Sequence, residues 1–327
     1  MASLVDKTTV GGTARGLSGV SFTLILIAVA GLTFVAGRWL GISYAFVMGY
    51  TIVQYIVLST AWNILGGYTG YVNFGVTAFF AMGSYSTVVL YKLTPTLPLP
   101  IMILVGGVVA GLVGLCTGYL TLRLRGVYFS IATLALAVVM QTLMTNWDLV
   151  GGARGAYVLR PREAPLIGGD YVQYLFLNML ILAVLAVATA RAIERAALGY
   201  GFAAIRDDEA AAEASGVPTL RLKLIATTLS GAFMGMAGAP LPYKDAFLEP
   251  TSVFSLDYAV NAIAMPLIGG TSSWLGPVIG AVLVGGLQEY VRVTISSAVN
   301  VLVVGLLLVI FVVAAPKGIV GLFQRKR

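Results

Sequence analysis

The sequence predicts an all-α polytopic membrane protein with about ten transmembrane helices, some of them short or broken. Hydrophobic residues make up 59% of the chain and charged residues only 10%, whereas soluble domains contain roughly 45–50% and about 25%. The apolar residues recur in runs close to the ~20 that cross a bilayer as a helix. The 39 glycines suit membrane helices, which associate by close backbone approach.

Breaks at charged residues, Gly or Pro define the expected elements. Residues 1–19 form a cytoplasmic segment, residues 20–315 the membrane domain, and residues 316–327 a cytoplasmic basic tail. Ala28-Val29-Ala30 is similar to a signal-peptidase site, but the apolar run continues to Gly37, so we expect the first span to be retained. The expected spans are residues 20–37, 43–66, 72–91, 98–120, 126–146, 171–190, 222–242, 258–270, 275–291 and 298–315.

The Lys and Arg residues predict the orientation, because positively charged loops remain in the cytoplasm. With the amino terminus inside, this set of spans places most of the 20 Lys and Arg residues on the cytoplasmic side. We therefore expect both termini in the cytoplasm. The same surplus accounts for the net charge of +7, so we do not interpret that charge as a nucleic-acid-binding surface.

Several kinds of chemistry are disfavoured by composition. The chain has no histidine and a single cysteine, Cys116, so we expect no metal site, no cofactor and no catalytic residues. No paired carboxylates lie at membrane depth, which argues against an intramembrane enzyme. No charged residue falls in the middle of an expected span, which argues against a proton-driven carrier.

Two segments have the composition of interrupted membrane helices. Residues 258–270 contain Pro266 and end in the glycine-rich turn 269–277, and residues 66–75 form a turn of similar make-up. Broken segments in the two halves of a transporter point to its translocation path. An inverted repeat with path-lining elements is one hypothesis, and two unrelated tight turns are the other. Side chains expected along the path, unless they only join helices, are Asn73, Phe74, Thr77, Tyr128 and Asn261.

The longest cytoplasmic connection is the loop of residues 191–221. Asp207 is expected to cap a short helix, with negative charge in the first turn and alanines after it. Gly216 suits the position after the helix, and Pro218 prevents its continuation. Such a helix either seats in a groove of another protein or packs on its own membrane domain. The expected coupling residues are Asp207, Asp208, Glu209, Ala210, Ala211, Ala212 and Gly216.

Four blocks carry a family resemblance. They are NILGGYTGYVNFGVTAFFAMGSY, LRLRGVYFSIATLAL, GYGFAAIRDDEAAAEASGVPTLRLKLIATTLSGAFMGMAGA and IGGTSSWLGPVIGA. In this order, between Asn63 and Ala281, the chain resembles the LivM-type permeases of branched-chain amino acid ABC importers. The resemblance implies a heteromeric complex in the bacterial inner membrane: this subunit, a second related permease, two cytoplasmic ATPases and a periplasmic solute-binding protein. It also implies that residues 207–215 contact an ATPase.

The resemblance implies inward translocation of branched-chain amino acids by a subunit that is not itself an enzyme. The chain has no phosphate-binding GxxxxGK[ST] loop, so ATP hydrolysis is expected on a partner. Urea or a short amide is an alternative substrate, because Asn73 stands near a position where relatives commonly carry His, and a neutral residue suits an uncharged ligand. A stand-alone channel or secondary carrier is the alternative from a different class.

Overall fold

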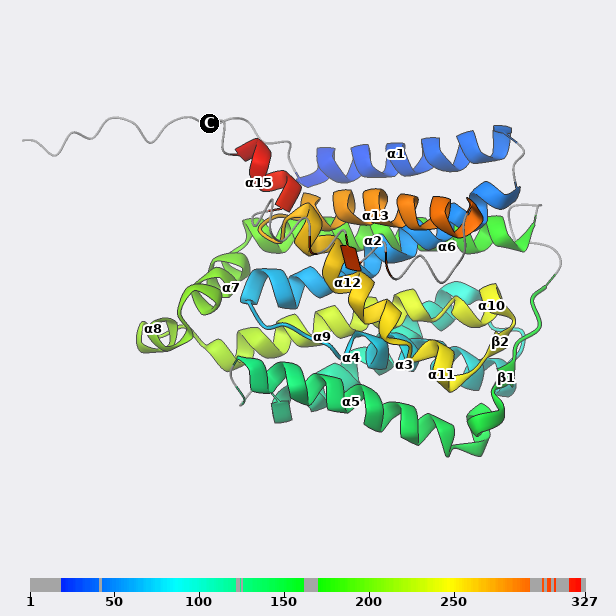
Figure 1. The fold of residues 1–327 in the computed structure, drawn as a ribbon, viewed down its shortest axis with the longest axis horizontal. Helices are drawn as coiled ribbons and strands as arrows, with labels where there is room; N and C mark the ends of the chain where they lie inside the picture. Colours follow the sequence, from blue (N-terminus) through cyan, green and yellow to red (C-terminus); the bar gives the residue numbers. More distant parts are fainter. Residues whose placement is uncertain are drawn as a thin grey trace, which may run out of the picture.

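The computed structural model describes residues 19–40, 43–121, 124, 126–161, 170–294, 302, 305, 306, 309 and 318–324. These residues form a helical bundle with one short strand pair (Figure 1). The long helices are α1 (Gly19–Leu40), α2 (Ser43–Thr69), α3 (Val76–Leu93), α4 (Leu99–Thr121), α5 (Val127–Thr145), α6 (Tyr171–Arg195), α9 (Thr219–Gly238), α12 (Leu256–Gly269) and α13 (Leu275–Thr294).

Shorter elements connect the long helices. Strands β1 (Ala156–Tyr157) and β2 (Phe247–Leu248) pair antiparallel, with Ala156 opposite Leu248. The remaining elements are the 3-10 turns η1 (Asp148–Val150) and η2 (Gly152–Arg154) and the helices α7 (Ala197–Asp207), α8 (Glu209–Ala214), α10 (Leu241–Asp245), α11 (Pro250–Val253) and α15 (Gly318–Gln324).

Seven of the expected spans are confirmed as helical segments long and apolar enough to cross a membrane, so the protein is a multi-pass membrane protein. They comprise α1, α2, α4, α5, α6, α9 with α10, and α11 with α12. Helices α3 and α13 coincide with two further expected spans but are not among these seven. The expected span 298–315 and the amino-terminal segment lie largely outside the described residues, and the expected tail is described only at residues 318–324, which form α15.

The expectation that a span begins at residue 72 is wrong, because α3 begins only at Val76. The residues between α2 and α3, which we call the connecting segment (residues 70–75), are not helical. Gly70 starts the segment with a φ of +78°, a conformation in which glycine carries no steric penalty. The Asn73 side chain then accepts a hydrogen bond from Gly75 N–H at 2.7 Å, which favours a turn over a helix.

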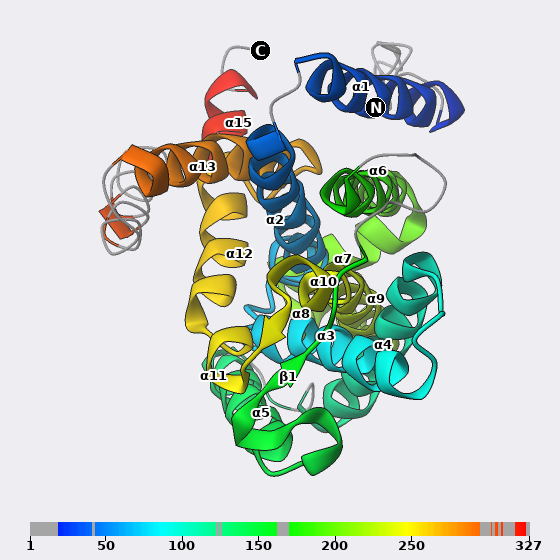
Figure 2. The ribbon, with the colours of Figure 1, turned by 90° about the vertical axis from the view of Figure 1, so that its right-hand side faces the viewer.

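Glycines set the close packing of α3, α4 and α9. A Cβ atom on Gly83 of α3 would lie 1.8 Å from the carbonyl oxygen of Gly235 in α9, and one on Gly235 would lie 2.3 Å from Ala110 Cβ in α4. Gly107 and Gly111 of α4 likewise face α9. The glycine spacings in the sequence are therefore packing contacts between membrane helices. Figure 2 shows α2 running through the middle of the bundle and α1 at its edge.

The two ends of the bundle differ. Helices α7 and α8 project at one end, whereas β1, β2, α10 and α11 lie at the other (Figure 1). The glycine pair expected to begin the first turn is instead the end of α2, and it meets the second glycine-rich turn at the α7 end, where a Cβ atom on Gly67 would lie 2.8 Å from the carbonyl oxygen of Thr271. An inverted repeat places corresponding turns at opposite ends, so these two turns are not such a pair. The inverted repeat itself stays a prediction.

Replacing Gly83 with Ala is expected to destabilise the protein by about 1–3 kcal/mol, the usual effect of overpacking. The added methyl group collides with the backbone of α9, which cannot yield as a flexible side chain does. The unfolding midpoint in detergent measures the effect. Gly286→Ala in α13 is the matched control, because a Cβ atom there meets nothing within 4 Å. Equal midpoints for the two variants would contradict the packing assignment.

Candidate coupling site and translocation path

Two helices rather than one follow α6 at the projecting end. Helix α7 was missed by the sequence analysis, although Leu198, Phe202 and Ile205 recur at helical spacing. Phe202 and Ile205 are buried and fix α7 against the membrane domain. Gly199 and Gly201 interrupt the pattern, because glycine is a poor helix former. The predicted single free helix is therefore the second member of a helix pair.

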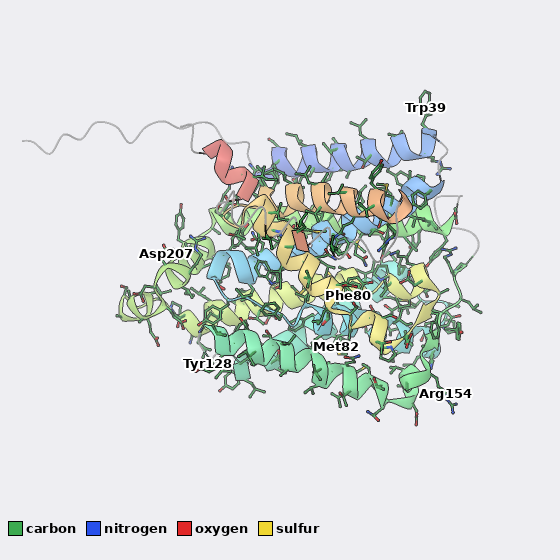
Figure 3. The ribbon with its side chains drawn as sticks, viewed as in Figure 1. Trp39, Phe80, Met82, Tyr128, Arg154 and Asp207 are labelled. Carbon is green, nitrogen blue, oxygen red and sulfur yellow. The ribbon has the colours of Figure 1, made fainter. Side chains whose placement is uncertain are left out.

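The cap of α8 is Asp208, and the prediction of Asp207 at that position is wrong. The Asp208 carboxylate accepts hydrogen bonds from the backbone N–H groups of Ala210, at 2.9 Å, and Ala211, at 3.1 Å. Asp207 is the last residue of α7, and its exposed carboxylate lies 3.5 Å from Arg206. Figure 3 shows Asp207 at the projecting end of the molecule. Only Asp208 has the extended backbone that a capping residue requires.

The prediction for the end of α8 is confirmed. Gly216 adopts a φ of +86°, and its N–H donates to the carbonyl oxygen of Glu213 at 3.0 Å. The N–H of Val217 donates to the carbonyl oxygen of Ala212 at 3.0 Å. Pro218 then serves as the residue before α9. These bonds satisfy the carbonyl groups that a short helix leaves open at its end.

Helix α8 has an inner and an outer face. Ala212 is buried, whereas Ala210, Ala211, Glu213 and Ala214 are exposed. The outer face therefore carries mainly methyl groups, which leave the helix backbone accessible to a shallow groove. The inner face holds α8 against the membrane domain.

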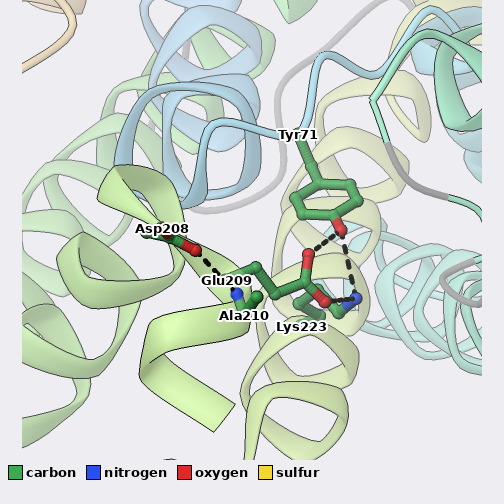
Figure 4. Close-up of polar contacts among 5 residues, drawn as sticks. All are labelled: Tyr71, Asp208, Glu209, Ala210 and Lys223. Carbon is green, nitrogen blue, oxygen red and sulfur yellow. Dashed lines mark hydrogen bonds and ion pairs between the residues drawn. The ribbon is translucent and has the colours of Figure 1, made fainter. Parts of the chain in front are cut away.

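Glu209 does not lie on the outer face as a solvent-exposed charge. One of its carboxylate oxygens lies 2.7 Å from Lys223 Nζ in α9, and the other accepts a hydrogen bond from Tyr71 OH in the connecting segment (Figure 4). Sequence analysis did not identify Lys223 or Tyr71. The burial of Lys223 could have been predicted from its place in α9, because it lies on the same helical face as the small residues Thr219 and Thr227. All three residues are buried.

Three of the predicted path residues lie close together. Asn73 is buried, and its side-chain oxygen is engaged by Gly75 N–H. Its carbonyl oxygen accepts a hydrogen bond from Trp62 Nε1 at 2.9 Å. Phe74 is partly exposed, and its N–H donates to Thr133 Oγ1 at 3.1 Å. Thr77 is buried in the first turn of α3.

The other two predicted path residues lie elsewhere. Tyr128, in the first turn of α5, is 72% exposed and projects outward (Figure 3). Asn261 of α12 accepts a hydrogen bond from Gln288 Nε2 at 2.6 Å and donates to Tyr55 OH at 3.3 Å. This network joins α2, α12 and α13. The structure therefore does not bring all five predicted path residues together, and the path stays a prediction.

Comparison with known proteins places the chain among transport permeases. The family model described as "Branched-chain amino acid transport system / permease component" matches residues 43–312. LivM, the high-affinity branched-chain amino acid transport system permease protein of Salmonella typhimurium, is 29% identical over 292 residues, which cover 81% of this chain and 67% of that protein. The LivM protein of Escherichia coli K12 shows the same identity and coverage.

A second kind of relative is also matched. The probable branched-chain amino acid transport permease protein LivH of Methanocaldococcus jannaschii is 24% identical over 270 residues, which cover 78% of this chain and 84% of that protein. No solved structure matches the chain. The match to the family model extends from the start of α2 past the end of α13 and includes α7, α8 and the connecting segment. The chain therefore belongs to the family of branched-chain amino acid transport system permease components.

Proposed function

We propose that this chain is a permease subunit of an ATP-driven importer that moves branched-chain amino acids inward across the bacterial inner membrane. Family membership makes it a transport component and not an enzyme. The proposal that the importer is driven by ATP depends on one observation, the projecting helix α8. Its outer face carries small, exposed side chains, and its inner face is bonded to the membrane domain.

A permease component works with other subunits of its system. We propose a second related permease, two cytoplasmic ATPases and a periplasmic solute-binding protein as those subunits. Two differently named permeases, LivM and LivH, are among the relatives of this chain, which supports a pair of related permeases in one complex.

The ATPase contact is proposed at the outer face of α8. Ala210, Ala211 and Ala214 are exposed there, and small side chains allow the backbone of a short helix to come close to the walls of a groove. Helix α7 gives α8 a firm base, because Phe202 and Ile205 of α7 are buried. A force applied to α8 by a moving ATPase is therefore passed to the membrane domain instead of bending a free loop.

The projecting end is proposed to be cytoplasmic. Arg195, Arg206 and Arg221 lie on the elements at this end, and such residues are enriched on the cytoplasmic side. Helix α1 begins at this end, and α15 lies there (Figure 1). These positions support the proposal that both termini are cytoplasmic.

Branched-chain amino acids are the proposed substrates because the relatives carry that substrate in their names. Urea as a substrate would require Asn73 to act as a ligand for a neutral amide. Its side-chain oxygen instead accepts from Gly75 N–H and helps to shape the turn before α3. No observation on the described residues favours urea over an amino acid.

Replacing Ala211 and Ala214 together with Arg is expected to abolish co-purification of the ATPase subunits without affecting membrane insertion. The long charged side chains prevent the outer face from seating in a groove, and both positions are exposed, so the fold tolerates them. The measurement is the yield of ATPase recovered with tagged permease from cells that express the complete system.

The matched control is Ala153→Arg, which replaces an exposed alanine in η2 at the opposite end of the bundle. It is expected to retain the ATPase subunits. Ala212 is unsuitable for this test, because it is only 6% exposed and a larger side chain there disturbs α8 itself. Normal recovery of ATPase with the double variant would contradict docking at α8.

In liposomes, the chain alone is expected to give no uptake of radiolabelled leucine. The complete set of subunits is expected to give uptake when ATP is supplied on the side of the ATPase subunits and the solute-binding protein on the opposite side of the membrane. Isoleucine and valine are expected to compete with leucine for uptake, and urea is not. Transport by the isolated chain would identify a channel or secondary carrier instead. Competition by urea would reverse the choice of substrate.

A further inference from the structure

Glu209, Lys223 and Tyr71 join three elements that are separate in the sequence. Glu209 is the first residue of α8, Lys223 lies in α9, and Tyr71 lies in the connecting segment (residues 70–75). Lys223 Nζ is 2.7 Å from one carboxylate oxygen of Glu209 and 3.2 Å from Tyr71 OH. Tyr71 OH donates to the other carboxylate oxygen, so the three groups close a ring of contacts (Figure 4).

This triad is shielded from solvent. The side chains of Lys223 and Glu209 are 3% and 14% exposed. The pair Arg206 and Asp207, whose Nε and Oδ1 atoms are 3.5 Å apart, is much more accessible, with side chains 39% and 74% exposed. Exposed pairs exchange readily with water and add little rigidity. A buried ammonium group depends on its partners, because it cannot recover its hydration in place. The triad is therefore a stiff connection between α8, α9 and the connecting segment.

Tyr71 carries this connection further into the bundle. Its ring packs edge-on against Phe129 of α5, with the ring centroids 5.1 Å apart. The next residue, Val72, accepts a hydrogen bond on its carbonyl oxygen from Ser130 Oγ at 2.8 Å, and Phe74 N–H donates to Thr133 Oγ1. Residues of the connecting segment are thus bonded to α5 along one side.

The connecting segment also determines how α3 begins. The hydrogen bond from Gly75 N–H to Asn73 Oδ1 precedes Val76, the first residue of α3. The bond from Trp62 Nε1 to the Asn73 carbonyl ties the same turn to α2. A displacement of Tyr71 therefore acts on the start of α3, on α5 and on α2 together, because interfaces packed this closely shift as units.

We propose that Glu209, Lys223 and Tyr71 transmit the movement of α8 to the connecting segment and so to the helices that open and close the path. In this proposal Glu209 is a positioning residue inside the permease and does not contact the ATPase. The inference rests on the proposed function, in which α8 receives the force from the ATPase.

The test uses the complete importer in liposomes with the substitution Tyr71→Phe. This variant keeps the ring against Phe129, the contact of that ring with Lys223 Nζ and the ion pair between Glu209 and Lys223. It removes the hydrogen bonds of the Tyr71 hydroxyl group to both members of the ion pair. The ATPase subunits are expected to remain bound and ATP hydrolysis to continue, while leucine uptake per ATP hydrolysed falls severalfold. Tyr44→Phe is the matched control, because Tyr44 is a partly exposed residue near the start of α2, and it is expected to retain the wild-type ratio.

A second variant, Glu209→Gln, separates transmission from docking. It is expected to retain the ATPase subunits and to lower uptake per ATP at least as much as Tyr71→Phe. Loss of the ATPase subunits from this variant would overturn the internal role of Glu209 and make it a docking residue, and a wild-type ratio in Tyr71→Phe would overturn transmission. Failure of the proposed function is distinguishable from either result, because it appears as uptake by the chain alone or as normal ATPase recovery in the double Arg variant of α8.

Discussion

A bilayer offers the backbone no hydrogen-bonding partners, and this constraint explains both the helices of the protein and the bonding of the connecting segment, which is not helical. A helix satisfies its own N–H and C=O groups, which is why apolar runs of membrane length fold as helices. The connecting segment cannot do this. Its polar groups are bonded to Trp62, Ser130 and Thr133 and to its own Asn73 side chain. Non-helical backbone is thus tolerated because the surrounding helices supply its partners.

The same constraint explains the role of glycine. Burial of apolar surface does not drive helices together in lipid, because the lipid tails are as apolar as the side chains. Membrane helices therefore associate largely through close packing of their backbones, and this packing requires residues without side chains where α3, α4 and α9 cross. Gly83, Gly235 and Gly106 fill that requirement.

Two cations of the described residues, Lys223 and Arg191, are buried against partners from other elements. Lys223 begins the apolar part of α9, yet it is nearly inaccessible to water because Glu209 and Tyr71 surround its ammonium group. Arg191 of α6 is similarly buried, with its guanidinium carbon 3.5 Å from the centroid of the Phe22 ring of α1. Both residues lie near the end that carries α7 and α8. Buried cations at this end connect elements that are far apart in the sequence, α6 with α1 and α9 with the connecting segment. These contacts make this end a packed part of the protein.

Sequence alone determined the fold class, because the length and polarity of an apolar run are local properties, and they decide by themselves whether the run inserts into a bilayer as a helix. It also determined the existence of α8, which ends before Gly216 because of local backbone preferences. The choice between Asp207 and Asp208 as the cap was decided by where α7 ends, and α7 forms because Phe202 and Ile205 find a buried site. The partners of Glu209 were decided by tertiary structure, since Tyr71 and Lys223 reach it only after three elements have packed. Buried amide side chains such as Asn73 and Asn261 enter different networks for the same reason. Hydrogen-bond partners depend on which helices become neighbours, and the local sequence does not specify that.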